Sequence, residues 1–228
     1  YVEMELEFEI KYSIAAQKNI NFLNSVGIEN PSIKFDKYGY RLYHNLTATY
    51  KELADKHNYV YYDIKSSVPT FFKLKMMKEG ITEDPFLDLF NGDFYLNFGR
   101  LIELEGNDKE IRNKAKDIFM YVANEKRRMD KRIMIKLQDK LPRFDLMCQR
   151  KRIARDLIND ESNFINKFIV PSLDIDKIMT IFDGLVIHKE SESIADEFFN
   201  KLKSDGCPIE FEKGLLPESK KKEVSHAV

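Results

Sequence analysis

The stretch from Ile178 to Ile187 constrains the fold most, because it predicts a β-hairpin around one acidic residue. It consists of two apolar runs, Ile-Met-Thr-Ile-Phe and Leu-Val-Ile, joined by Asp183-Gly184. Asp-Gly favours a tight turn, since both residues tolerate the positive backbone angles that a hairpin turn needs. A second predicted strand, residues 58–63, ends on Asp63. Two rigidly held carboxylates from distant strands are what a two-metal phosphoryl-transfer site requires.

The other segments alternate between strand-like and helical patterns. Apolar residues and glutamates alternate without a break from Val2 to Ile10, which predicts a half-buried strand with an acidic outer face. Further helices are expected over residues 12–27, 46–56, 70–78, from 108 onward, 144–169 and 193–203, and a last strand over 207–212. This order predicts an α+β fold, with an antiparallel sheet packed by helices on one side.

Charge is distributed unevenly along the chain. The net charge is −1, yet Lys109 to Arg155 contains 16 Lys/Arg and 6 Asp/Glu, so this part carries 16 − 6 = +10 and the remainder −11. Segregation of this kind indicates a polyanionic partner for the central segment. The alternative is a solvated pair of helices whose basic side chains keep the protein soluble. We expect four segments: 1–107, a basic helical part 108–143, a part 144–216 with the hairpin, and a disordered tail 217–228.

Composition excludes several classes of protein. A transmembrane helix requires a run of about eighteen or more apolar residues, and the sequence has none. Cys148, Cys207 and four scattered histidines have no zinc-site spacing, so we expect reduced, non-catalytic thiols and a cytoplasmic location. Because the chain starts at Tyr1 without an initiator Met, we expect an excised fragment or a processed product.

The predicted site has a metal part and a nucleotide part. Hard oxygen ligands suit Mg²⁺, and Asp63 and Asp183, with the carbonyl of Ile64, are the expected ligands of two Mg²⁺ ions. Arg112 and Lys116 are four residues apart, so they project from one helix face and form a candidate triphosphate clamp. Each feature also has an ordinary interpretation: a turn residue, a helix cap and a solvated helix face.

The order of these motifs resembles the palm and fingers of family A DNA polymerases and of single-subunit phage-type RNA polymerases. Residues 61–70, Tyr-Tyr-Asp-Ile-Lys-Ser-Ser-Val-Pro-Thr, are similar to the first metal motif in its divergent viral and mobile-element form. Residues 112–121 resemble the nucleotide-binding helix, and Phe182-Asp183-Gly184 resembles the last metal motif. Residues 149–151 and 160–162 resemble the helix that precedes it, and residues 40–42 the arginine-bearing segment.

The chain departs from the family at three positions. Phe182 stands where the family has His, Val68 where DNA polymerases have a sugar-selecting Glu, and Asn124 where a Tyr is expected, with Tyr121 nearby. The departure at Val68 leaves the choice between deoxynucleotides and ribonucleotides open.

The resemblance implies a template-dependent nucleotidyltransferase with a palm-like sheet and a fingers-like basic segment. Its expected partners are a primer–template and nucleoside triphosphates, with room for additional domains or subunits outside this chain. Asp63 and Asp183 are then the catalytic metal ligands. The implied nucleotide-binding residues are Arg112, Lys116, Tyr121 and Arg41. The implied nucleic-acid contacts are Lys126, Arg127, Arg128, Lys131, Arg132, Gln149 and Arg150.

Two alternatives remain open from the sequence. One is a non-catalytic nucleic-acid-binding or assembly module derived from a palm domain. The other is a metal-dependent nuclease, for which Glu161 is the nearest candidate for a third carboxylate.

Overall fold

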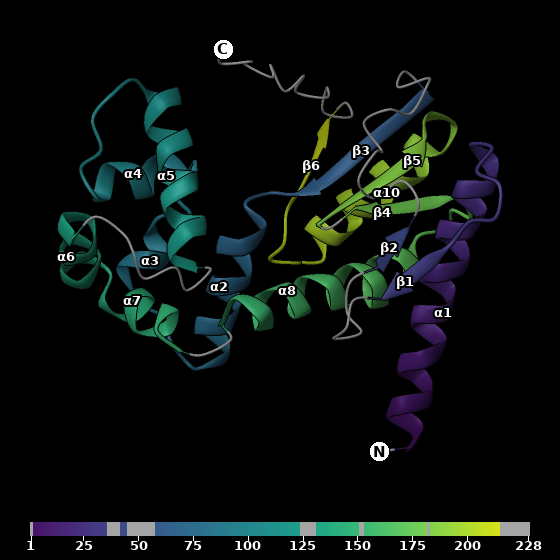
Figure 1. Cartoon of the computed structure of the whole chain (residues 1–228), viewed down its shortest axis with the longest axis horizontal. Coiled ribbons are helices and arrows are strands. Elements are labelled where there is room, and N and C mark those ends of the chain that lie inside the picture. Colours follow the sequence, from purple (N-terminus) through teal and green to yellow (C-terminus); the bar gives the residue numbers. More distant parts are fainter. Residues whose placement is uncertain are drawn as a thin grey trace, which may run out of the picture. The chain divides into compact units, whose positions relative to one another are not determined.

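The structure, a computed structural model, describes residues 2–35, 42–44, 58–123, 131–150, 153–181 and 183–214 (Figure 1). Helices pack on a four-stranded antiparallel sheet, which confirms the predicted α+β class. The chain forms two compact units, Tyr1–Lys65 with Ser162–Val228 and Ser66–Glu161. The basic segment 108–143 belongs wholly to the second unit. Among the described residues, no helix combines the length and apolar character needed to cross a membrane.

The sheet of the first unit has the strand order β4-β5-β3-β6. Its strands are β3 (Tyr59–Ile64), β4 (Ile178–Ile181), β5 (Gly184–His188) and β6 (Phe211–Gly214). The hairpin predicted around Asp183 is confirmed, since Ile181 pairs with Gly184 across the β4–β5 turn. The last strand begins later than predicted, at Phe211 instead of Cys207. A separate two-stranded sheet pairs β1 (Ile33–Phe35) with β2 (Leu42–His44).

Helices cover both faces of this sheet, not one face as predicted. Successive side chains of β3 point to opposite faces. On one face, helix α1 (Val2–Ser25) contributes Phe22 to a core cluster with Tyr59 and Val186. Val26, the residue after the helix, packs against the same cluster. On the other face, the ring of Tyr62 lies 4.9 Å from that of Phe199 in α10 (Glu192–Ser204). A short 3-10 turn, η4 (Lys189–Ser191), leads from β5 into α10.

The predicted strand at Val2–Ile10 is wrong, because these residues form the first part of α1. The four glutamates there, and Met4 and Leu6 between them, are good helix formers. No Gly or Pro separates them from the helix predicted over 12–27, so one helix continues through both segments. That helix ends close to its predicted position, and Gly27 follows with a φ of 78°.

The long helix predicted over 144–169 is also wrong, because the structure divides it. The pieces are α7 (Pro142–Cys148), α8 (Ile153–Asn163), the π-helix η3 (Phe164–Ile169) and α9 (Val170–Ser172). After α7, Arg150 forms a bidentate ion pair with Glu79, at 2.6 and 3.2 Å. At the other end, Pro171 has no N–H to donate, and the widened π-turns immediately precede it.

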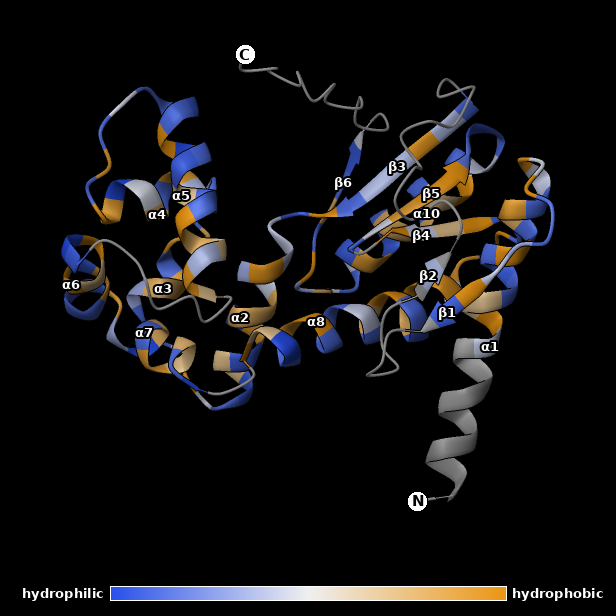
Figure 2. Cartoon of the chain, viewed as in Figure 1, coloured by the Kyte–Doolittle hydropathy of each residue, from blue (hydrophilic) through white to orange (hydrophobic). Residues whose placement is uncertain are grey.

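The second unit is built on an aromatic core. Its helices are α2 (Ser67–Lys78), α3 (Pro85–Asp88), α4 (Phe94–Leu101), α5 (Asp108–Ala123), α6 (Lys131–Lys140) and α7. The helix predicted over 70–78 is thus confirmed as α2, with an earlier start. The buried rings of Phe72, Phe86, Phe98, Phe119 and Phe144 pack together at the centre. Hydrophobic and hydrophilic residues are interspersed along α5, as expected for a helix with one buried face (Figure 2).

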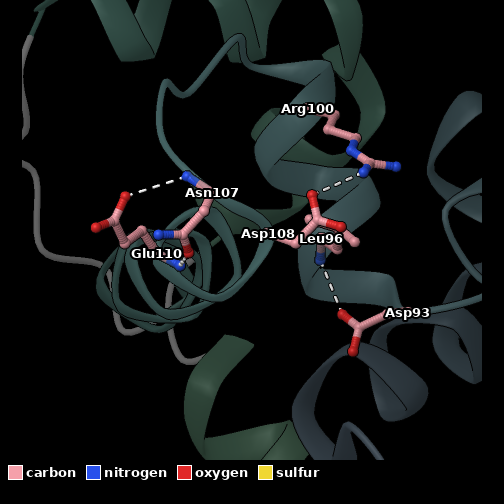
Figure 3. Close-up of polar contacts among 6 residues, drawn as sticks. All are labelled: Asp93, Leu96, Arg100, Asn107, Asp108 and Glu110. Atoms are coloured by element: carbon pink, nitrogen blue, oxygen red, sulfur yellow. Dashed lines mark hydrogen bonds and ion pairs between the residues drawn. The ribbon is translucent and has the colours of Figure 1, made fainter.

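Polar side chains fix the starts of α4 and α5 (Figure 3). Asp93 Oδ1 accepts a hydrogen bond from Leu96 N at 2.9 Å, which caps α4. Asn107 and Glu110 form a reciprocal pair, because each side chain accepts the other's backbone N–H at 3.1 Å. This capping box confirms the predicted helix start at Asn107–Asp108. Arg100 in turn donates to Asp108 at 2.9 Å.

Candidate functional site

Asp63 lies on β3 of the first unit, and Asp183 lies in the turn between β4 and β5, directly before the first residue of β5. In the β3–β5 ladder, Asp63 is paired with Gly184, the residue that follows Asp183. The backbone N–H of Ile64 also donates to the carbonyl of Asp183 at 3.2 Å. The two segments that carry the aspartates are therefore neighbours in the sheet. Both aspartates are half-buried.

A tyrosine holds the Asp63 side chain. Tyr61 and Asp63 are two residues apart on β3, so they point to the same face of the sheet. The phenol hydroxyl of Tyr61 donates to Asp63 Oδ1 at 3.1 Å. Sequence reasoning missed this contact, although the i, i+2 spacing within a predicted strand was the feature that could have revealed it.

Gly184 has a different role from the predicted one. It is the first residue of β5, and its backbone is outside the left-handed region. A Cβ at this position would lie 2.5 Å from Cε2 and 2.6 Å from Cζ of Tyr61. Glycine is therefore needed here because the Tyr61 ring leaves no room for a Cβ. Gly184 itself pairs with Ile181, so it lies in the strand and not in the turn.

The oxygen donors at this place fit Mg²⁺. The ion takes one or two protein carboxylates and fills its octahedron with water and substrate phosphates. Asp63 and Asp183, with the carbonyl of Ile64, would provide such a donor set. The described residues contain no group of three or more His, Cys, Asp or Glu side chains arranged to bind a metal. Asp63, Asp183 and the Ile64 carbonyl therefore stay a predicted donor set.

Two further glutamates bear on the number of carboxylates. Glu212 is the cross-strand partner of Asp63 on β6 and is exposed, and sequence reasoning did not include it. Glu161, the candidate third carboxylate of a nuclease, is 3% exposed in the second unit. Its Oε2 accepts a 2.7 Å hydrogen bond from Ser67 Oγ. The position of Glu161 is explained by this buried contact within the second unit.

Arg112 and Lys116 share the solvent-exposed face of α5, as their spacing predicted. Both cations lie over the ring of Tyr95, at 5.8 and 5.9 Å from its centroid. The buried stripe of the helix, which includes Ile111 and Phe119, lies beside these two residues. This packing fixes the orientation of α5, so the two cations project together from the second unit.

A carboxylate already contacts Arg112. The Nε–H of Arg112 donates to Asp93 Oδ2 at 2.7 Å. Burial alone would raise the pKa of the Asp93 carboxyl, but the hydrogen bonds from Arg112 and Leu96 outweigh burial and lower it. Asp93 thus remains an anion, and it occupies a position on Arg112 that a phosphate oxygen could also take.

The other predicted contact residues are dispersed. Lys131 and Arg132 are exposed at the start of α6. Arg150 pairs with Glu79, and Gln149 donates to Asp145 Oδ2 at 2.6 Å. Tyr121 is half-buried on α5. The predictions that lie outside the described residues are Arg41, Lys126, Arg127, Arg128, the helix 46–56 and the tail 217–228.

The two cysteines are not candidates for the predicted metal or nucleotide site. Cys148 is buried, Cys207 is half-buried, and both are thiols. Burial, and to a smaller extent the charge of Asp145, raises the pKa of the Cys148 thiol. A raised pKa leaves little thiolate, the reactive form.

Comparisons with protein families, with curated proteins and with solved structures find no match for this chain.

Proposed function

We propose that the chain is the catalytic part of a template-dependent nucleotidyltransferase with a polymerase-like palm. Asp63, Asp183 and the Ile64 carbonyl would bind Mg²⁺, which supplies charge stabilisation for phosphoryl transfer to a primer 3′-hydroxyl. The observation that carries this proposal is the pairing of Asp63 with Gly184, because Asp63 is then the cross-strand neighbour of the residue that follows Asp183.

Arg112 and Lys116 support the nucleotide part of the proposal. A triphosphate needs cations that act together, and these two side chains extend from one exposed face over one aromatic ring. The guanidinium would bind phosphate oxygens in a fork geometry and the ammonium would act as a point charge. Lys131, Arg132 and the other basic residues of the +10 segment would contact the phosphate backbone without reading sequence.

The test is primer extension with wild-type protein and with Asp63→Asn and Asp183→Asn. Both substitutions remove a charge and keep the side-chain volume, so incorporation is expected to be lost, while primer–template binding stays nearly unchanged. All four combinations of DNA or RNA template with deoxy- or ribonucleotides are needed, because Val68 leaves sugar choice open.

Asp174→Asn is the matched control, since Asp174 is an exposed aspartate of the same unit. It should extend primers at the wild-type rate. Incorporation by both site variants at the wild-type rate would refute the proposal.

A second candidate function has one specific observation in its favour. Arg112 is already neutralised by Asp93, as expected if a palm-derived domain had lost its nucleotide and kept only nucleic-acid binding. A non-catalytic module would bind nucleic acid with a strong salt dependence. It would incorporate no nucleotide with any primer–template at any Mg²⁺ concentration, and a nuclease would shorten the labelled strand.

A further inference from the structure

We propose that Tyr61 is the positioning residue for the metal-binding carboxylate of Asp63. Only a glycine at position 184 leaves room for the Tyr61 ring. This inference rests on the proposed function, because it assumes that Asp63 binds Mg²⁺. It adds two residues that take no part in binding the ion themselves.

The Tyr61 ring is held from two sides. It packs against the core cluster that includes Met179, Ile181 and Val186. Its far edge lies over Gly184, the cross-strand partner of Asp63. A ring placed in this way has little freedom to rotate, so its hydroxyl reaches a defined point above the sheet.

The hydroxyl uses this fixed point to orient Asp63. It donates to Oδ1 at 3.1 Å, and a hydrogen bond to a ligating carboxylate selects one rotamer for metal binding. Removal of such an outer partner commonly lowers metal affinity by about 10- to 100-fold. Because Tyr61 is half-buried and its hydroxyl bond is not short, we expect the lower end of this range.

The opposite face of the same strand offers a matched control. Tyr62 also donates its hydroxyl to an aspartate, Asp196 in α10, at 2.7 Å. That bond is shorter than the Tyr61–Asp63 bond and lies on the other face of β3. Tyr62→Phe therefore removes an equivalent tyrosine–aspartate bond without touching Asp63.

The experiment measures Mn²⁺ affinity by electron paramagnetic resonance for the whole chain and four variants. Tyr61→Phe keeps the ring and removes only the hydroxyl, and we expect its Mn²⁺ dissociation constant to rise about tenfold. Gly184→Ala displaces the ring and should weaken Mn²⁺ binding to a similar extent. Tyr62→Phe should bind like the wild type, and Asp63→Asn should bind weakest. Circular dichroism melts confirm that each variant is folded at the assay temperature.

Two outcomes overturn different statements. If Asp63→Asn weakens Mn²⁺ binding but Tyr61→Phe and Gly184→Ala bind like the wild type, Tyr61 has no positioning role and the proposed function is unaffected. If Asp63→Asn itself leaves Mn²⁺ affinity unchanged, the metal site is wrong and the inference fails with it.

Discussion

Gly184→Ala is expected to destabilise the protein only while the Tyr61 ring is present. The backbone at Gly184 accepts any L-residue, so strain in the main chain does not contribute. The added methyl group would instead lie 2.5 Å from Cε2 and 2.6 Å from Cζ of Tyr61, well inside van der Waals contact. The ring must shift, and it then loses part of its packing and its bond to Asp63.

The magnitude follows from two opposing contributions. Overpacking of this kind costs about 1–3 kcal/mol. Replacing Gly by Ala at a compatible backbone position stabilises by about 0.4–1 kcal/mol, because the unfolded chain loses freedom. The net expectation for Gly184→Ala is a destabilisation of about 0–2.6 kcal/mol. In a Tyr61→Ala background the clash is absent, and the same substitution should stabilise by about 0.4–1 kcal/mol.

The assay is urea unfolding of the wild type, the two single variants and the double variant, followed by circular dichroism. The double-mutant cycle isolates the interaction of the two positions, and we expect a coupling free energy of about 1–3 kcal/mol. A cost for Gly184→Ala that is the same in both backgrounds, within about 0.5 kcal/mol, would refute the packing argument.

Two further predictions concern the second unit. Asp93→Asn should raise triphosphate affinity several-fold in a calorimetric titration, because Asn still caps α4 while Arg112 loses its competing anion; Arg112→Ala should abolish the gain. Glu103 has a pKa lowered to about 2, first by the hydrogen bond from Lys136 and then by that from Lys140. Its contribution to stability is present above the ordinary Glu value of 4.5 and is lost as the pH falls from 4.5 toward 2. Glu103→Gln should therefore lose less stability than the wild type between about pH 6 and about pH 3 in urea unfolding, by a small amount since the pair is exposed.

Local sequence patterns correctly predicted those helices and strands whose apolar residues follow one clear pattern. The β4–β5 hairpin, β3 and α10 came from apolar runs bounded by turn residues or from helical spacing, and each is present. The error at Val2–Ile10 arose because alternation describes side-chain polarity, whereas Glu, Met and Leu also favour helix and the following helix extends through them. Periodicity alone could not decide between the two.

Interactions between distant residues escaped prediction. The break after α7 coincides with the Arg150–Glu79 ion pair, whose partners are 71 residues apart. The Asp93–Arg112 pair and the Tyr61–Gly184 contact likewise join separate segments. The adjacency of Asp63 and Asp183 was an expectation from motif order, and only the strand register could establish it.

The most direct measurement is a crystal structure of the chain grown with Mn²⁺ and a non-hydrolysable nucleoside triphosphate, with anomalous data at the manganese edge. We predict anomalous peaks bonded to the carboxylates of both Asp63 and Asp183, with two ions about 3.5–4 Å apart. Saturating Mn²⁺ and triphosphate with no peak at either aspartate would contradict the two-metal site.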